Sequence, residues 1–288
     1  MSGNSNLYKI FQALSLDIVL GAVIFSYAIS LYFQSPISYS ALTCLAIAIW
    51  LIYTADHLLD AQKTIDKPAT FRHQFHKQFR KPLVVMAVLL LLIGAVIAYF
   101  LPRVILYNGL VGVLLTGIYF LLLQSKSFWQ KEVCVAIGYT WGICLAPVCI
   151  NWGQLALVQL LLIPQVFLLV FANLLIFSWF DMSNDKQDGH QSMVIRWGEK
   201  RARIGIILII VAGVLLSLFT MVFPLHENNT GAEAEPMHIM EAILLLMFGI
   251  LWLIFKNHPF FRKNEAYRVI GDGIFFIPVL FILYASQH

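Results

Sequence analysis

Charged residues are scarce in this chain of 288 residues: they make up 12% of the sequence, against 60% for hydrophobic residues. A soluble globular domain typically carries about 25% charged residues. The apolar runs are also too long and too frequent for a soluble core. The composition therefore excludes an ordinary soluble fold and predicts an integral membrane protein.

The chain also lacks a cysteine framework and any linker. Its four cysteines lie within apolar runs at spacings that match no metal or disulfide pattern, and we interpret them as core residues: Cys44, Cys134, Cys144 and Cys149. No Gly-Ser linker or low-complexity tract interrupts the sequence. We therefore expect one membrane-embedded domain over residues 1–288.

Nine apolar runs are long enough to span a bilayer. They cover approximately residues 14–33, 39–60, 83–101, 103–123, 132–151, 156–180, 204–223, 238–255 and 268–285. The first run has neither a basic start nor a small-residue cleavage site, so we expect it to be retained as a span. The predicted fold class is all-α, with nine transmembrane helices around a central cavity.

The net charge of +4 is distributed along the chain in a way that predicts topology, not nucleic-acid binding. If the N-terminus is cytoplasmic, every lysine and arginine except Arg103 falls on the cytoplasmic side of nine spans. This is the positive-inside pattern. It predicts an outside C-terminus in a cell membrane, for which we expect the inner membrane of a bacterium.

Two pairs of aspartates stand where apolar runs end: Asp56 with Asp60, and Asp181 with Asp185. Carboxylates four residues apart lie on one face of a helix, and like charges beside lipid need a cation to neutralise them. Oxygen-only ligands suit Mg²⁺, with Mn²⁺ as a second option, and Mg²⁺ commonly completes its shell with substrate phosphates. The pairs therefore predict metal ligands at the catalytic site of an enzyme that handles a diphosphate at the cytoplasmic face.

The segment after the second pair resembles a motif of the UbiA-type intramembrane prenyltransferase family. In that motif Asp-x-x-x-Asp is followed by a glycine, a hydroxyl residue with an apolar neighbour, and a final glycine. The matching positions here are Asp181, Asp185, Gly189, Ser192, Met193 and Gly198. The family is also built from nine transmembrane helices, the number that hydropathy predicts for this chain.

The first pair matches the last two aspartates of the family's other motif, Asn-Asp-x-x-Asp-x-x-x-Asp. Ile52 and Tyr53 stand at its leading Asn-Asp. The resemblance extends to DKPATFR and, more weakly, to the stretch from Tyr119 to Trp152. It implies four basic ligands for a substrate diphosphate: Lys67, Arg72, Lys126 and Lys186. Tyr53, Asp188 and Asn173 are candidates for supporting roles around the site.

The resemblance implies ionisation of an allylic prenyl diphosphate and transfer of the isoprenoid to a lipophilic, usually aromatic acceptor. Three other functions stay open. A terpene cyclase would carry out the same ionisation without an external acceptor. A transporter or lipid-binding protein would use its acidic pairs for a coupling cation, and a structural homologue would have lost catalysis together with the missing Asn. The expected partners are the prenyl diphosphate, the acceptor and the bilayer, with no nucleic acid and no obligate protein partner.

Overall fold

The computed structural model describes residues 9–63, 71–122, 129–187, 191–222 and 231–287, and within these ranges the regular structure is helical, with no β-strand. Eight helical segments are long and apolar enough to cross a membrane. A ninth apolar helix, α2, is shorter at 17 residues. The helical segments coincide with the nine predicted runs, so the all-α multi-pass fold class is confirmed.

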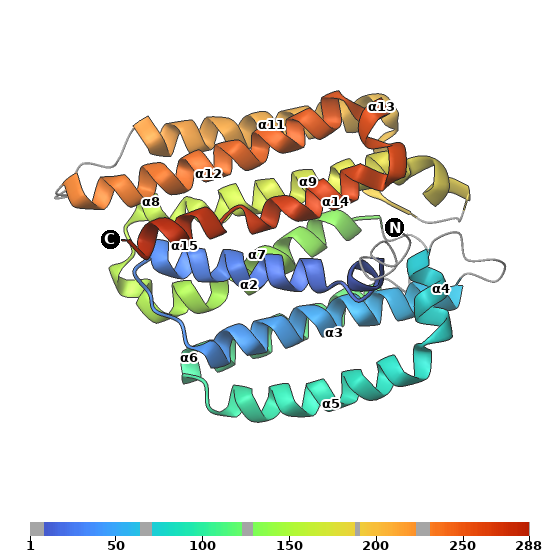
Figure 1. Cartoon of the computed structure of the whole chain (residues 1–288), viewed down its shortest axis with the longest axis horizontal. Coiled ribbons are helices and arrows are strands. Elements are labelled where there is room, and N and C mark those ends of the chain that lie inside the picture. The colour runs from blue at the N-terminus through green and yellow to red at the C-terminus, as the bar shows by residue number, and fades with distance from the viewer. Residues whose placement is uncertain (1–8, 64–70, 123–128, 188–190, 223–230, 288) are drawn as a thin grey trace.

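The long helices run back and forth along one direction (Figure 1). Their bounds are α2 Leu16–Tyr32, α3 Tyr39–Lys63, α5 Arg80–Tyr99, α6 Arg103–Leu122, α7 Lys131–Asn151, α9 Leu162–Gln187, α11 Glu199–Val222 and α12 Gly231–Lys256. Short helices join them: α4 Phe71–Gln78, α8 Leu157–Leu160, α10 Met193–Trp197 and α13 His258–Phe261. Helices α4 and α13 lie at one end of the bundle, and α8 lies at the other (Figure 1).

Helix α9 is the central element. In the span that contains it, Leu157–Lys186, 56% of the residues in the most apolar stretch are buried, as expected of a helix that is apolar on all sides. By contrast, only 6% of the residues are buried in the most apolar stretch of α5 and of α6, which expose side chains such as Leu92 and Val113. Such a surface is stable only against lipid, so these two helices form an outer face of the bundle in the membrane.

The first span begins at a bend. Ser15 precedes α2 with a left-handed φ of 54°, which separates the helix from the turn before it. The predicted run of residues 14–33 is therefore a helix of 17 residues. The boundary differs from the hydropathy pattern because apolar composition does not register a change of backbone direction.

The last span is an interrupted helix. It consists of α14 Ala266–Gly273, a 3₁₀ turn at Ile274–Phe276 and α15 Val279–Ala285. Pro278 has no backbone N–H and cannot continue a regular helix from the preceding turn. The break leaves α14 free to follow its own direction against α9 near the acidic end of the bundle.

Candidate active site

Asp56, from the first acidic pair, is held by a lysine of another helix. The Lys131 Nζ donates to both Asp56 carboxylate oxygens, at 3.2 and 3.0 Å. Lys131 is the first residue of α7, and Asp56 lies in the last turns of α3. Asp60 lies one turn further along α3, but its side chain is outside the described residues.

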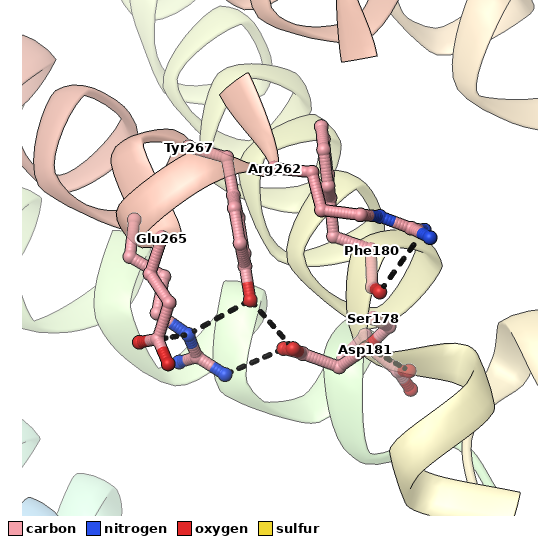
Figure 2. A network of polar contacts seen from close by, with 8 residues as sticks. Ser178, Phe180, Asp181, Arg262, Glu265 and Tyr267 are labelled. Atoms are coloured by element: carbon pink, nitrogen blue, oxygen red, sulfur yellow. Dashed lines mark hydrogen bonds and ion pairs between the residues drawn. The ribbon is translucent and has the colours of Figure 1, made fainter. Parts of the chain in front are cut away.

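Asp181, from the second pair, is held by two residues of α14 (Figure 2). Tyr267 donates its hydroxyl to Asp181 Oδ1 at 2.6 Å, and the Arg268 guanidinium forms an ion pair with Oδ2 at 2.5 Å. Arg268 Nε also donates to the Tyr267 hydroxyl at 3.2 Å. The Tyr267 ring stacks on Phe180 at 4.3 Å between centroids, nearly parallel, which fixes where its hydroxyl points.

The two helices that carry the aspartate pairs, α3 and α9, both contact the first turn of α7. While Lys131 binds Asp56, the next residue, Glu132, is buried at 4% exposure and turns toward α9. Its carboxylate accepts from the Ser178 hydroxyl at 2.7 Å and from the Met193 backbone N–H at 3.2 Å. Ser178 lies three residues before Asp181, so adjacent residues of α7 position both acidic helices at one end of the bundle.

Two residues of the segment after Asp185 have clear backbone roles. The Ser192 hydroxyl accepts from the Ile195 backbone N–H at 3.2 Å and so caps the start of α10. Gly198 ends α10 with φ of +78°, a conformation that favours glycine. The hydroxyl and glycine positions of the sequence motif therefore shape the connection from α9 to α11.

A pocket lies among α2, α3, α7, α9 and the broken last span. It is lined by Ile18, Tyr53, Tyr139, Val170, Asn173, Leu174, Asp272 and Phe275. Apolar and aromatic side chains form most of its wall, and four polar side chains share it. This combination is typical of sites for small organic molecules.

Some of the remaining predicted residues are described by the structure, and others are not. Lys186 is described and exposed near the end of α9, and Asp185 is half-buried one turn after Asp181. Lys67, Lys126, Asp188 and the side chain of Arg72 lie outside the described residues. Tyr53 and Asn173 both line the pocket. Across the described part of the chain, no cluster of three or more His, Cys, Asp or Glu side chains has the arrangement of a metal site.

Several functional candidates were missed by the sequence analysis. Lys131, Glu132, Tyr267 and Arg268 contact or position the acidic pairs, yet the sequence offers only their place at the start of a predicted span as a signal. Tyr139 lines the pocket from the middle of an apolar run. Lysine and arginine at such positions are already explained by the positive-inside pattern, so nothing in the sequence marked these as partners of aspartates.

The architecture defines a multi-pass membrane protein that has acidic residues at one end of its bundle and a largely apolar pocket nearby. The model of the UbiA prenyltransferase family matches residues 55–267, which is most of the chain. The chain therefore belongs to the UbiA prenyltransferase family, a family of enzymes that transfer prenyl groups. No curated protein matches it.

Solved structures share its fold at low sequence identity. A UbiA homologue from Archaeoglobus fulgidus bound to GPP and Mg²⁺ superimposes with a TM-score of 0.71 at 14% identity, covering 97% of this chain and 98% of that one. An apo UbiA homologue from Aeropyrum pernix K1 gives 0.60 at 18% identity, over 95% and 98%. A structure described as digeranylgeranylglyceryl phosphate synthase gives 0.55 at 14% identity, over 98% and 97%.

Proposed function

We propose that this protein ionises an allylic prenyl diphosphate in the presence of Mg²⁺ and transfers the isoprenoid to a lipophilic acceptor of aromatic type. The observation that carries the proposal is the joining of both Asp-x-x-x-Asp helices to the first turn of α7, beside an apolar pocket. GPP, which the A. fulgidus homologue binds with Mg²⁺, is a prenyl diphosphate.

The acidic residues fit a hard divalent cation. Asp56, Asp60, Asp181 and Asp185 offer only carboxylate oxygens, the donors that Mg²⁺ and Mn²⁺ prefer. Two of them form ion pairs with cations of the protein itself, Asp56 with Lys131 and Asp181 with Arg268, so a metal ion that bound them would share or displace these partners. Mg²⁺ bound there would neutralise part of the negative charge that develops on a departing diphosphate.

Four basic residues complete the proposed diphosphate site. We assign Lys67, Arg72, Lys126 and Lys186 to the substrate diphosphate, since cationic side chains stabilise the charge that develops on this leaving group. Asp188 is proposed to support the second pair. The apolar wall of the pocket would hold the isoprenoid and keep water from the reactive carbon.

Topology follows from the same distribution of charge. We propose that the acidic end of the bundle faces the cytoplasm, with the C-terminus outside, in a bacterial inner membrane. A single cysteine introduced at Gln287 should then react with a membrane-impermeant maleimide in intact cells, in a background whose native cysteines are replaced. Labelling of this position only after lysis would reverse the proposed orientation.

The function is tested with purified protein in lipid nanodiscs. The protein is incubated with Mg²⁺ and allylic diphosphates of several lengths, with and without aromatic acceptors, and both diphosphate release and prenylated product are measured. Product that forms only with acceptor and disappears on chelation supports the transferase. Cyclised hydrocarbon without acceptor would favour a terpene cyclase, and no diphosphate release at any chain length would contradict both enzymatic functions.

A further inference from the structure

A buried polar cluster lies where α9, α11 and α12 pack together, toward the end of the bundle opposite the aspartate pairs (Figure 1). It consists of Gln165 on α9, Ser217 and Thr220 on α11, and Glu241 on α12, each at most 1% exposed. Gln165 precedes Asp181 by more than four turns of α9, which is about 24 Å along the helix axis. The cluster is therefore separate from the proposed diphosphate site.

Glu241 places a carboxyl group inside a membrane span, Glu235–Lys256. Its two oxygens accept from Gln165 Nε2 at 3.1 and 3.0 Å. Within the described part of the chain, no lysine, arginine or histidine forms an ion pair with it. An ionised carboxylate inside a membrane is costly unless a positive charge compensates it. Glu241 therefore requires a positive charge that the described side chains do not supply.

The cluster presents more hydrogen-bond acceptors than hydrogens. The two N–H groups of Gln165 Nε2 face three acceptors, namely both Glu241 oxygens and Thr220 Oγ1, which lies 3.0 Å away. The Thr220 hydroxyl donates its own hydrogen to the Ser217 backbone carbonyl at 3.0 Å, so it offers only lone pairs to the cluster. Side-chain oxygens thus converge without enough hydrogens to link them, and a cation among them would satisfy this excess.

Two further oxygens of the cluster have no hydrogen-bond partner among the described residues: Ser217 Oγ and Gln165 Oε1. The Ser217 hydroxyl lies close enough to influence the Glu241 carboxyl group, yet it forms no hydrogen bond. The Gln165 amide turns about a soft terminal torsion, so its oxygen can turn toward an ion on the carboxylate while one N–H stays on Glu241. Buried polar atoms are almost always satisfied, so these two atoms beside a carboxylate point to a ligand.

Burial and charge restrict this ligand to a small monovalent cation. The burial of all four side chains excludes an ion that keeps its water shell, as Mg²⁺ usually does. A single carboxylate balances one positive charge, so a divalent ion would keep a charge without compensation. A proton would neutralise Glu241 but could reach only one of the two unpaired atoms. A dehydrated Na⁺ contacts several hard oxygen donors at once.

We propose that this cluster binds one Na⁺ ion inside the membrane. The ligands are the Glu241 carboxylate, the hydroxyl oxygens of Ser217 and Thr220, and the amide oxygen of Gln165. Because they come from three helices, the ion stabilises the packing of α9, α11 and α12 against one another. The inference is independent of the proposed function, since none of the four residues belongs to the proposed diphosphate site.

Binding of radioactive Na⁺ to the full-length protein in nanodiscs tests the proposal, with choline chloride holding the ionic strength constant and empty nanodiscs as the blank. The wild type should bind one Na⁺ per chain saturably. Na⁺ should also raise its unfolding temperature relative to choline, because a ligand that binds only the folded state stabilises it. Absence of saturable Na⁺ binding at both neutral and alkaline pH overturns the inference.

Variants assign the ion to the cluster. Glu241→Gln removes the charge with little change in shape and should weaken Na⁺ binding at least about tenfold. Ser217→Ala should weaken it by about threefold to tenfold. Glu235→Gln is the matched control, since it makes the same substitution at an exposed position of α12 and should leave Na⁺ binding unchanged. Wild-type Na⁺ affinity in Glu241→Gln, or an equal loss in Glu235→Gln, would place the ion elsewhere and overturn the inference.

Infrared spectroscopy distinguishes Na⁺ from a proton as the occupant. In the wild type, Na⁺ should change the carboxylate stretching bands, and Glu241→Gln should abolish that change. A protonated carboxyl band that persists in saturating Na⁺ and disappears in Glu241→Gln would identify a proton on Glu241. That result would also overturn the proposed Na⁺ site.

Discussion

Arg268 and Asp181 lie 87 residues apart in the chain and meet in an ion pair between α14 and α9, with the Tyr267 hydroxyl on the other carboxylate oxygen. The carboxylate thus has a cationic partner of its own before any metal binds. A metal that uses Asp181 has to compete with this guanidinium. The strength of the pair therefore bears on the Mg²⁺ requirement of the enzyme.

Removal of Arg268 should lower the stability of the protein without metal and strengthen its binding of Mg²⁺. In Arg268→Leu the partly buried carboxylate of Asp181 loses its partner, so we expect a loss of about 1–3 kcal/mol of stability without metal. Mg²⁺ should restore more stability to this variant than to the wild type, and should bind it more tightly. Thermal unfolding across a Mg²⁺ titration measures both effects.

Arg262→Leu is the control for that experiment, because Arg262 contacts the Phe180 backbone carbonyl and ring (Figure 2). It should leave the Mg²⁺ dependence as in the wild type. An identical Mg²⁺ response in Arg268→Leu and Arg262→Leu would show that Arg268 does not compete with metal.

Neutralising the second acidic pair should abolish catalysis without unfolding the protein. Asp181→Asn and Asp185→Asn keep side-chain volume but remove the charge that holds a metal, and we expect turnover of prenyl diphosphate to fall by at least about a hundredfold in each. Diphosphate release is the assay, and size-exclusion profiles check the fold. Wild-type turnover in both variants would refute the metal role.

The first motif offers a gain as well as a loss. Ile52 cannot ligate a metal, so Ile52→Asn should tighten Mg²⁺ binding if the position faces the ion as in the family motif.

Tyr53 lines the pocket, and Tyr53→Phe should lower turnover or raise the Mg²⁺ requirement if its hydroxyl orients substrate or Asp56. A metal titration in which Tyr53→Phe matches the wild type would reduce Tyr53 to a packing residue.

Two glycines of α14 give a matched pair for the contact with α9. Gly271→Ala would press a methyl group on Phe177 and Asn173, so we expect a stability loss of about 1–3 kcal/mol. Gly273→Ala has nothing within 4 Å of the new methyl group among the described residues and should be neutral or slightly stabilising. Equal unfolding temperatures for the two variants would contradict the close approach at Gly271.

The fold was predictable because the bilayer imposes a length on every apolar run, and the nine runs reappear as helices with small shifts of their ends. The side-chain contacts between helices were not predictable. The Lys131–Asp56 and Glu132–Ser178 contacts join residues 75 and 46 positions apart, and such contacts depend on how helices rotate against one another. Hydropathy carries no information on that rotation.

The pocket illustrates the same limit in another way. Asn173 stood out in the sequence because a polar residue in an apolar run is costly, whereas Tyr139 did not, since tyrosine is common in membrane helices. The bend at Ser15 and the break before Pro278 also escaped prediction. Both change the direction of the backbone and leave the apolar composition unaltered.

The adjacency of Lys131 and Glu132 has a mechanical consequence. Neighbouring residues of a helix point about 100° apart, so α7 grips α3 with one side chain and α9 with the next. A rotation of α7 about its own axis would therefore change both contacts together. The relative rotation of the helices that carry the two acidic pairs, α3 and α9, is thus set against the same turn of a third helix.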